Sequence, residues 1–433
     1  MRVFLLAPDF RTLGGFELQL ATLAVQLCQS GVAVEVFFRQ PVRADHPYRA
    51  RMAAAGVRVH APPAWLAALI DPPPPRRQRA LRLCLSLLAP LAWPAAWLAG
   101  AAQRRSWRRA WQAAQGWLNA RLAPLFYWDA LTGWMALSLD WTSLWRRPDL
   151  VDVQHSMLPF GIRYGKRRRL PTIYTEYGSP AADLWPVWSG LVPVINQADF
   201  IIGRAEASLA GLRELCGASR PMAVVPNAVT QLPDGAAPAE QHGPEIETVI
   251  TTVGRLAPEK GLFVLLDAFH LLLAGGVGAR LRLAGDGPLR AELAARAQAL
   301  GIAGQLEMLG SFDTLAPIMR ATDILAHPTL NDGRSVAVLE AMAWGRPVVA
   351  SRTGGLAEIV EDHVTGLLVP PGDAAALAAA LRELALDADL RQRLGHAARS
   401  RFEAGNFTQR GLVTATLSIY HQVLGVSEQQ IAS

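Results

Sequence analysis

Short apolar runs and stretches of helix-spaced apolar residues alternate near the start of the chain. Residues 3–7 form an apolar run, and a loop with Gly14 and Gly15 follows it. Residues 16–30 carry apolar side chains at helical spacing, and residues 32–38 form a second apolar run. A strand, a glycine loop, a helix and another strand are typical of parallel sheets whose faces are covered by helices.

The same alternation continues in two later parts of the chain. Short apolar runs that end in turn residues predict strands, and apolar residues three or four positions apart predict helices. In the first half the predicted strands are residues 150–153, 172–174, 200–202 and 222–225. In the second half they are residues 248–253, 280–284, 305–309, 324–327 and 347–350, with helices at 261–274, 288–300, 335–344 and 374–386. The pattern predicts an α/β protein with two Rossmann-like βαβ domains.

The length of 433 residues suits two domains of ordinary size. Residues 231–247 are rich in Pro, Gly, Ala and charge, and we expect them to link the domains. The first domain then covers residues 1–230 and the second residues 248–405. The last segment, residues 406–433, contains a helix that we expect to pack back toward the first domain.

Residues 62–147 interrupt the alternation and predict a helical insert in the first domain. Ten of the chain's 13 tryptophans lie there, and residues 72–128 contain neither Asp nor Glu. Arginines border an uncharged stretch, residues 83–102, which is about as long as a bilayer core requires. Because Pro90 and Pro94 would break a spanning helix, we do not expect this stretch to cross a membrane.

Tryptophan and arginine at the edges of an apolar stretch favour the headgroup level of a membrane, and the lack of acidic residues favours anionic lipid. We therefore expect residues 76–112 to lie in a membrane surface. The alternative is a helical pair that packs on the first domain with its arginines in water.

The overall composition limits the compartment and the partners. The formal net charge is +6, and the insert makes a membrane rather than nucleic acid the expected partner. The three cysteines, Cys28, Cys84 and Cys216, are far apart and have no metal-binding spacing, which favours a reducing compartment. The apolar run at the N-terminus is too short for a signal peptide. We expect a bacterial protein, rich in Ala and Arg, at the cytoplasmic face of the inner membrane.

Two cations follow the strand predicted at residues 248–253. Gly254 forms the turn, and Arg255 and Lys260 stand five positions apart before a helix. Arg offers a planar fork to phosphate oxygens, Lys offers a compact charge, and a helix N-terminus adds free N–H groups. This pattern indicates a phosphate site, and a solvated charged loop is the alternative.

The segment from residue 329 to residue 351 is more specific. Asp332 lies in a predicted loop, and Gly333 and Ser335 suit the start of a helix, whose first N–H groups would be free to bind a diphosphate. Glu340 follows in an otherwise apolar helix, where a carboxylate needs a hydrogen-bonding partner. A sugar hydroxyl would serve, and a structural bond to a nearby helix cap is the alternative.

This segment resembles the signature of retaining glycosyltransferase family 4. Two acidic residues, Asp332 and Glu340, have seven residues between them, and a small-residue stretch and Gly345-Arg346-Pro347-Val348-Val349 follow. The companion motifs stand in order at residues 225–229, 254–261, 285–287, 353–358 and 365–373. The resemblance is strong over residues 248–425 and looser over 1–40 and 148–230. It implies the GT-B fold, in which two Rossmann-like domains face each other across a cleft.

The resemblance also implies roles for single residues. Arg255 and Lys260 would clamp the donor diphosphate and stabilise the leaving charge. Glu340 would bind the ribose, and Asp332 would hold hydroxyls of the transferred sugar. Catalytic roles thus fall on Asp332, Arg255 and Lys260, with His155 as a further candidate. Donor-binding roles fall on Arg255, Lys260, Gly333, Arg334, Ser335, Val336, Glu340, on Gly310 and Ser311 at the base, and on Gly14 and Gly15 near the phosphates.

The chain departs from the family pattern at two places. The family usually has Glu where this chain has Asp332, which is one methylene shorter. The family often has a histidine after the strand near residues 172–175, where this chain has Tyr177. His155, at the end of the preceding strand, is expected to line the cleft, although a structural role is the alternative.

A DxD pattern at residues 387–389 stands between two alanine-rich helical stretches, and we interpret it as a helix cap and turn. No metal and no cofactor is therefore expected, and a UDP- or GDP-linked sugar would be the donor substrate.

The resulting hypothesis is a retaining glycosyltransferase whose acceptor is a glycan or lipid-linked saccharide, or a lipopolysaccharide core, at the membrane. A non-catalytic nucleotide-sugar-binding scaffold and an epimerase or hydrolase of the same fold are the alternatives.

Overall fold

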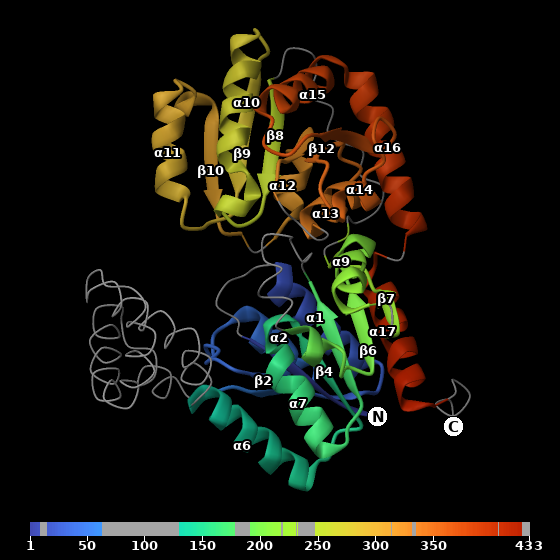
Figure 1. Cartoon of the computed structure of the whole chain (residues 1–433). Coiled ribbons are helices and arrows are strands. Elements are labelled where there is room, and N and C mark those ends of the chain that lie inside the picture. Colours follow the sequence, from blue (N-terminus) through green and yellow to red (C-terminus); the bar gives the residue numbers. More distant parts are fainter. Residues whose placement is uncertain are drawn as a thin grey trace, which may run out of the picture.

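Two parallel sheets, each covered by helices, lie one above the other in the computed structural model (Figure 1). The structure describes residues 1–8, 15–62, 130–177, 191–217, 220–230, 232, 247–312, 314–330, 335–405 and 407–426. The membrane insertion expected of residues 76–112 falls outside these ranges. No helix within them is long and apolar enough to cross a membrane.

The first sheet has the strand order β3-β2-β1-β4-β5-β6-β7, and all neighbouring strands are parallel. Its strands are β1 Arg2–Ala7, β2 Ala33–Phe38, β3 Arg58–His60, β4 Leu150–Gln154, β5 Thr172–Glu176, β6 Phe200–Gly203 and β7 Met222–Val224. The helices around it are α1 Gly15–Gln29, α2 Pro47–Ala54, α6 Ala130–Trp145, α7 Leu158–Arg168 and α9 Glu206–Cys216, with the short η1 His155–Met157. The central strands β1 and β4 are buried on both sides, as expected where helices cover both faces of a sheet.

The second sheet has the order β10-β9-β8-β11-β12-β13 and is also parallel. Its strands are β8 Thr248–Val253, β9 Ala279–Ala284, β10 Leu306–Gly310, β11 Ile324–His327, β12 Val348–Ser351 and β13 Gly366–Val369. Its helices are α10 Leu262–Ala274, α11 Arg290–Ala299, α12 Ala316–Arg320, α13 Val336–Ala343, α14 Leu356–Ile359, α15 Ala374–Leu386 and α16 Ala388–Ala404, with the short η3 Pro258–Lys260 and η4 Ala303–Gln305.

The last helix, α17 Gln409–Leu424, returns to the first domain (Figure 1). Thr408 begins it, because its side chain accepts a hydrogen bond from the N–H of Gly411 at 3.1 Å. The buried Tyr420 hydroxyl donates to Asp152 at 2.7 Å, and Gln409 bonds to Gln26 of α1 at 2.9 Å. The chain thus ties its C-terminal helix to β4 and α1 of the first domain.

A carboxylate of the second domain caps a helix of the first. The two oxygens of Glu358, on α14, accept hydrogen bonds from the N–H groups of Glu206 and Ala207 at 2.9 and 2.7 Å. Ala205 in the cap position of α9 has no side chain that could do this. Since the first N–H groups of a helix have no partner within it, Glu358 satisfies them and complements the helix dipole.

The predicted strands all occur, with ends shifted by one or two residues. The short β3 and β13, and several helices, α2, α7 and α16 among them, were not predicted individually. The interpretation of residues 387–389 as a helix cap is confirmed, since the Asp387 side chain accepts a hydrogen bond from the Leu390 N–H at 2.8 Å at the start of α16.

Candidate functional site

The strand orders locate the candidate site before any side chain is considered. In each sheet the order reverses beside the first strand, between β1 and β4 and between β8 and β11. Ligands of open parallel sheets bind at the carboxyl ends of the strands at such a switch point. Those ends point toward the other domain in both sheets (Figure 1), so the two switch points face each other.

The loop after β8 carries the two predicted phosphate ligands. Gly254 has φ 145° and Gly261 has φ 63°, backbone conformations that favour glycine. Arg255 and Lys260 stand between these glycines, and Arg255 forms an ion pair with Glu259. The Arg255 side chain is 53% exposed, so its pair with Glu259 leaves it accessible to a ligand.

The loop after β11 holds the β8 loop in place. The N–H of Leu330 and the hydroxyl of Thr329 both donate to the carbonyl oxygen of Glu259, at 2.8 and 2.9 Å. A Cβ at Gly261 would lie 2.0 Å from the Pro328 carbonyl oxygen. The two loops of the switch point are therefore in direct contact, and only glycine fits between them.

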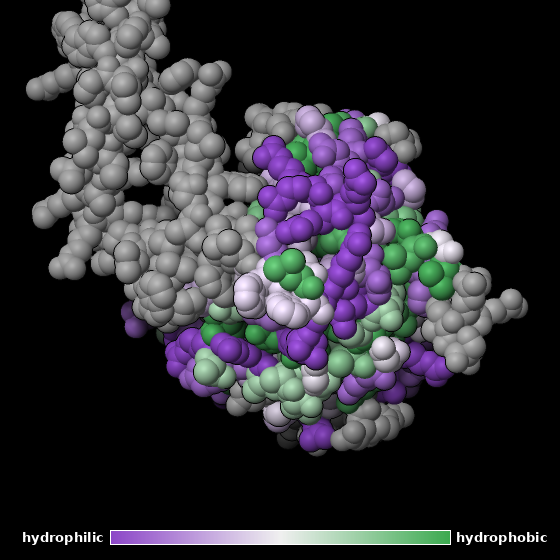
Figure 2. All heavy atoms as spheres, turned by 90° about the horizontal axis from the view of Figure 1, so that it is seen from below, coloured by the Kyte–Doolittle hydropathy of each residue, from purple (hydrophilic) through white to green (hydrophobic). Residues whose placement is uncertain are grey.

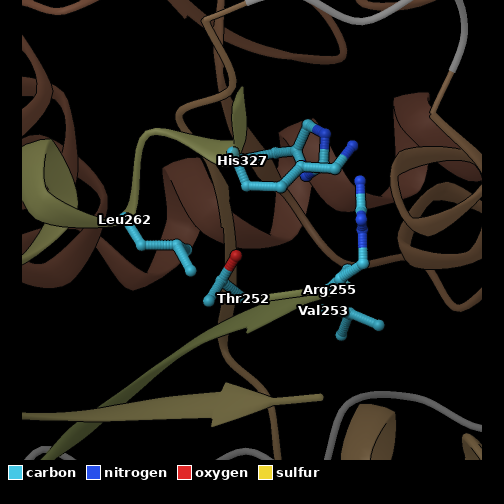
Figure 3. Close-up of a pocket in the computed structure, with 7 residues that line it drawn as sticks. Thr252, Val253, Arg255, Leu262 and His327 are labelled. Atoms are coloured by element: carbon cyan, nitrogen blue, oxygen red, sulfur yellow. The ribbon is translucent and has the colours of Figure 1, made fainter. Parts of the chain in front are cut away.

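A small pocket lies at this contact (Figure 3). Its walls are Thr252, Val253, Gly254, Arg255, Lys260, Leu262 and His327. Figure 3 shows Thr252, Arg255 and His327 around the same opening. Sequence reasoning placed Arg255 and Lys260 here but missed His327, the last residue of β11, which is buried. A histidine closing an apolar strand beside the switch point was the signal that could have revealed it.

The helix α13 starts close to where the sequence predicted it. Ser335 is the buried N-cap residue, with extended backbone, and Val336 is the first helical residue. The Ser335 side chain makes no cap hydrogen bond, so the first N–H groups of α13 donate none to it. Asp332, Gly333 and Arg334, which precede this helix, lie outside the described residues.

Glu340 is a buried carboxylate in α13. Burial raises its pKa from 4.5 to about 8. Within the described part of the chain its carboxylate accepts no hydrogen bond, so the alternative of a structural bond to a helix cap finds no support there. An ionised carboxyl group without a partner is costly to bury, and the raised pKa keeps Glu340 protonated at neutral pH in the free protein.

Three glycines bring the carboxyl ends of β8, β9 and β10 close together. A Cβ at Gly285 would lie 1.9 Å from the carbonyl oxygen of Gly254, and the Gly285 N–H donates to the carbonyl of Gly310 at 2.9 Å. Gly310 has φ 74°, and Ser311 after it is exposed. The predicted base-binding turn therefore stands beside the phosphate loop, at the same edge of the sheet.

In the first domain, His155 stands at the carboxyl end of β4. Its Nδ1 lies 2.9 Å from Oε1 of Glu176, the last residue of β5, which is fully buried. Burial opposes the charged imidazolium, but the Glu176 carboxylate outweighs it and raises the pKa of His155. His155 has φ 43°, rare for a residue other than glycine and often found at functional sites. Sequence reasoning found His155 but not Glu176.

A buried polar network fills the space beside this pair. Asp152 accepts hydrogen bonds from Gln154, Thr175 and Tyr420, and its pKa is raised to about 6 because burial outweighs these bonds and the charge of Arg204. Tyr177 donates to Gln154 at 2.8 Å and accepts from Arg204 at 2.8 Å, and the Arg204 guanidinium lies 4.4 Å from the centre of its ring.

Tyr177, at the position where the family often has a histidine, is held in this network by Gln154 and Arg204. It is partly buried between Phe16, whose ring meets it edge-on, and Arg204. No local pattern indicates this network, since Asp152, Tyr177 and Arg204 are separated by up to 52 positions.

The described residues of the glycine loop after β1 are few. Gly15 begins α1, and Gly14 lies outside the described residues. Tyr48 of α2 is close enough to Glu17 of α1 and Glu340 of α13 to be affected by both: burial, and then these two charges, raise its pKa to about 12. The charge of Glu340 thus acts on a residue of the first domain, a proximity that the sequence did not predict.

The comparisons with known proteins agree with this arrangement. Residues 237–401 match the family described as "Glycosyl transferases group 1". A lipopolysaccharide core biosynthesis glycosyltransferase, LpsE of Rhizobium meliloti, is 26% identical over 61% of this chain and 79% of its own length. A phosphatidyl-myo-inositol mannosyltransferase of Mycobacterium leprae is 33% identical over 45% of this chain, which spans only 52% of that protein.

Solved structures share the fold over nearly the whole chain. The Anabaena protein HepE, in a complex with UDP and glucose, has a TM-score of 0.70 at 18% identity, covering 97% of this chain and 99% of its own. The predicted two-domain α/β fold is confirmed as that of the GT-B glycosyltransferases. Residues 237–401 are similar to group 1 glycosyltransferases, and the protein is a glycosyltransferase.

Proposed function

We propose that this protein transfers a sugar, with retention at the anomeric carbon, from a nucleotide-linked donor to an acceptor presented at a membrane. The proposal rests on the side chains that gather at the switch point of the second sheet. Arg255 and Lys260 line one pocket with His327, and Glu340 provides a buried carboxylate on the helix that follows β11. Cations for a diphosphate and a carboxylate for sugar hydroxyls are the groups that a nucleotide-sugar requires.

In this proposal each predicted donor ligand keeps its role. Arg255 and Lys260 bind the diphosphate and stabilise the charge that develops on it as the glycosidic bond breaks. Glu340 accepts hydrogen bonds from the ribose, and the turn at Gly310 and Ser311 borders the base. The loop before α13, with Asp332, Gly333 and Arg334, holds the transferred sugar and the diphosphate together with Ser335 and Val336. Gly14 and Gly15 approach the donor from the first domain.

The His155–Glu176 pair marks the acceptor side of the proposal. It lies at the carboxyl end of the first sheet, where the switch point faces the second domain. An imidazole held by a buried carboxylate through Nδ1 can present Nε2 to a hydroxyl group of fixed orientation. Retention requires no protein nucleophile here, because the leaving diphosphate can take the proton of the acceptor hydroxyl.

The nature of donor and acceptor follows from the relatives. HepE binds UDP and glucose, which makes a UDP-sugar the first donor to test and a GDP-sugar the second. The names of the rhizobial and mycobacterial relatives mention a lipopolysaccharide core and a phosphatidylinositol. A lipid-linked saccharide or lipopolysaccharide core is accordingly the proposed acceptor, and assembly of a cell-surface polysaccharide the proposed process.

A donor panel tests the proposal. UDP-, GDP-, ADP- and dTDP-sugars are incubated with the protein, a membrane lipid extract and EDTA, and free nucleotide and labelled lipid are measured. We expect lipid-dependent release from one donor without added metal. Nucleotide release without any acceptor would indicate a hydrolase instead, and binding without any turnover would indicate a scaffold.

The chain supplies a matched control, since it has two lysines, Lys260 and Lys166. Lys260→Ala should abolish transfer and weaken nucleotide binding at least tenfold. Lys166 pairs with Asp199 at 2.7 Å on the first domain, so Lys166→Ala should leave nucleotide binding unchanged. Equal binding by the two variants would contradict the assignment of the diphosphate site.

A further inference from the structure

A small apolar surface is exposed at the end of α6, in the first domain. Trp141, Leu144 and Trp145 are 68%, 72% and 76% exposed. Met135 and Leu139 of the same helix are completely buried against the sheet. The helix therefore uses one face for the core and leaves three large apolar side chains of its last turns in water. We call Trp141, Leu144 and Trp145 the α6 patch.

Arginines surround the α6 patch. Arg146 and Arg147 follow it directly and are exposed. Arg167 and Arg168, at the end of α7, reach Asp140 of α6 at 3.2 and 3.1 Å, and a hydrogen bond of 2.7 Å between Ser143 and Tyr164 holds the two helices side by side. Figure 2 shows a small hydrophobic area enclosed by hydrophilic side chains on this face.

A shallow depression continues the basic surface toward the ends of β4 and β5. Arg147 and Arg169 line it together with Pro148, Asp149, Leu170, Pro171 and Leu424. Across the whole face, five exposed arginines at positions 146, 147, 167, 168 and 169 stand against the carboxylates of Asp140 and Asp149. The face is therefore positively charged around an apolar centre.

This combination fits one kind of partner. Tryptophan favours the headgroup level of a bilayer, arginine binds lipid phosphates there, and each further basic residue strengthens the attraction to an anionic surface. A second copy of the chain is a poor occupant, because a twofold contact through this face would place the arginines of both copies against each other. Nucleic acid would satisfy the arginines but would leave Leu144 without an apolar partner.

We propose that the protein docks on an anionic lipid bilayer through the α6 patch and its surrounding arginines. None of its residues belongs to residues 76–112 or to the donor site, and the inference does not depend on transferase activity. The patch lies at the end of the first domain that faces away from the second (Figure 1). The site between the domains then stands about one domain diameter, on the order of 30 Å, above the bilayer. That position suits an acceptor whose reactive sugar is held well away from its lipid anchor.

A probe at the patch tests the docking directly. Cys28 and Cys84 are replaced by Ser, Leu144→Cys is labelled with an environment-sensitive fluorophore, and phosphatidylcholine vesicles with or without phosphatidylglycerol are added. We expect a blue shift with the anionic vesicles alone, reversed by high salt. The matched control is Leu271→Cys, on α10 of the second domain, which is 46% exposed and should show no shift. An unshifted Leu144→Cys probe on protein that floats with the vesicles would overturn the proposal, since another segment would then bind.

Vesicle flotation of substituted full-length protein gives the second measurement. Arg146→Glu with Arg147→Glu should lower partitioning to anionic vesicles by about tenfold or more. Arg393→Glu with Arg410→Glu, an equal charge change at exposed arginines elsewhere, should lower it less. Thermal unfolding and nucleotide binding show that each variant is folded. Equal loss from both pairs would mean that net charge alone drives binding. A dimer in solution that Leu144→Ala dissolves without affecting flotation would assign the patch to a second copy; either result contradicts the proposal.

Discussion

At the residue scale, two buried carboxylates dominate the candidate site, and their surroundings differ. Glu340 is enclosed by apolar neighbours of α13, and burial raises its pKa to about 8. Glu176 is as deeply buried, but it accepts hydrogen bonds from His155 and Tyr174. The first carboxylate lacks a partner within the described chain, and the second positions an imidazole. This difference leads to opposite expectations for their substitution.

Glu340→Gln should make the free protein more stable at pH 8 and weaken its binding of nucleotide. The folded state keeps a proton on Glu340 that the unfolded state releases, so the stability due to this group is full below pH 4.5 and is lost as the pH rises through about 8. Because Gln does not titrate, Glu340→Gln avoids this loss and should raise the free energy of unfolding by about 1–3 kcal/mol at pH 8. Chemical denaturation at pH 5 and pH 8 measures this difference in stability. Calorimetry of the same variant should give at least tenfold weaker nucleotide binding. A variant that binds nucleotide as wild type does would refute the ribose role.

Glu176→Gln should lower the pKa of His155, because the neighbouring carboxylate is what raises it. The stability that charged His155 contributes is present below the pKa of the unfolded chain and is lost as the pH rises through the higher folded value. Histidine NMR titration follows the change. Glu214→Gln, at an exposed position of α9, serves as the control and should leave the titration of His155 unaltered. No change in the Glu176→Gln protein would mean that the pair is not formed in solution.

At the element scale, the donor site depends on how closely the ends of neighbouring strands approach. The loops after β8, β9 and β10 touch through Gly254, Gly285 and Gly310, and the loop after β11 closes on Gly261. At Gly285 and Gly261 a Cβ would strike backbone atoms, so no side-chain movement can make room for it, whereas Gly254 and Gly310 have a positive φ that favours glycine. The glycines of the family motif therefore have a structural reason in this chain.

Gly285→Ala should disturb the phosphate loop and destabilise the second domain by about 2 kcal/mol or more, since its Cβ would lie 1.9 Å from the Gly254 carbonyl oxygen and its φ is 145°. The affinity for nucleotide should fall as well, because the phosphate loop is disturbed. Gly304→Ala is the matched change, because a Cβ there meets nothing within 4 Å. Thermal unfolding and nucleotide titration compare the two, and similar behaviour of both variants would show that the loops adapt.

At the scale of the whole molecule, two separate contacts hold the two domains together. Glu358 caps α9 from the second domain, and α17 ends on Asp152 of the first through Tyr420. Asp152 belongs to the same buried network as Tyr177 and Arg204, near the His155–Glu176 pair. Through Tyr420 and Asp152, the helix that follows the second domain is thus joined to the buried network beside His155 and Glu176.

Glu358→Ala should loosen the contact between the domains. The first N–H groups of α9 lose their partner, which costs about 1 kcal/mol, and open arrangements of the domains become more populated. Small-angle X-ray scattering should then give a larger radius of gyration in the absence of nucleotide. Glu383→Ala removes an exposed carboxylate of α15 and should leave the radius unchanged. An unaltered radius for Glu358→Ala would show that α17 alone fixes the arrangement.

The sequence by itself determined most of the strands and helices of this protein and suggested its donor ligands. Local patterns decide where strands and helices form, and the phosphate motif is a run of adjacent residues, so Arg255, Lys260, Ser335 and Glu340 could be proposed from local motifs and from the resemblance to a known family. The second, motif-bearing half was predicted in more detail than the first for the same reason.

The tertiary structure decided which distant residues meet. Glu176 beside His155, and Tyr420 beside Asp152, are joined by strand order and by the return of α17, which no local pattern encodes. Burial is equally non-local: the same glutamate type is held unpaired at Glu340 and paired at Glu176, because the surrounding packing, and not the residue itself, sets its partners and its pKa. The sequence therefore specified the chemical groups of the site, and the fold specified their environment.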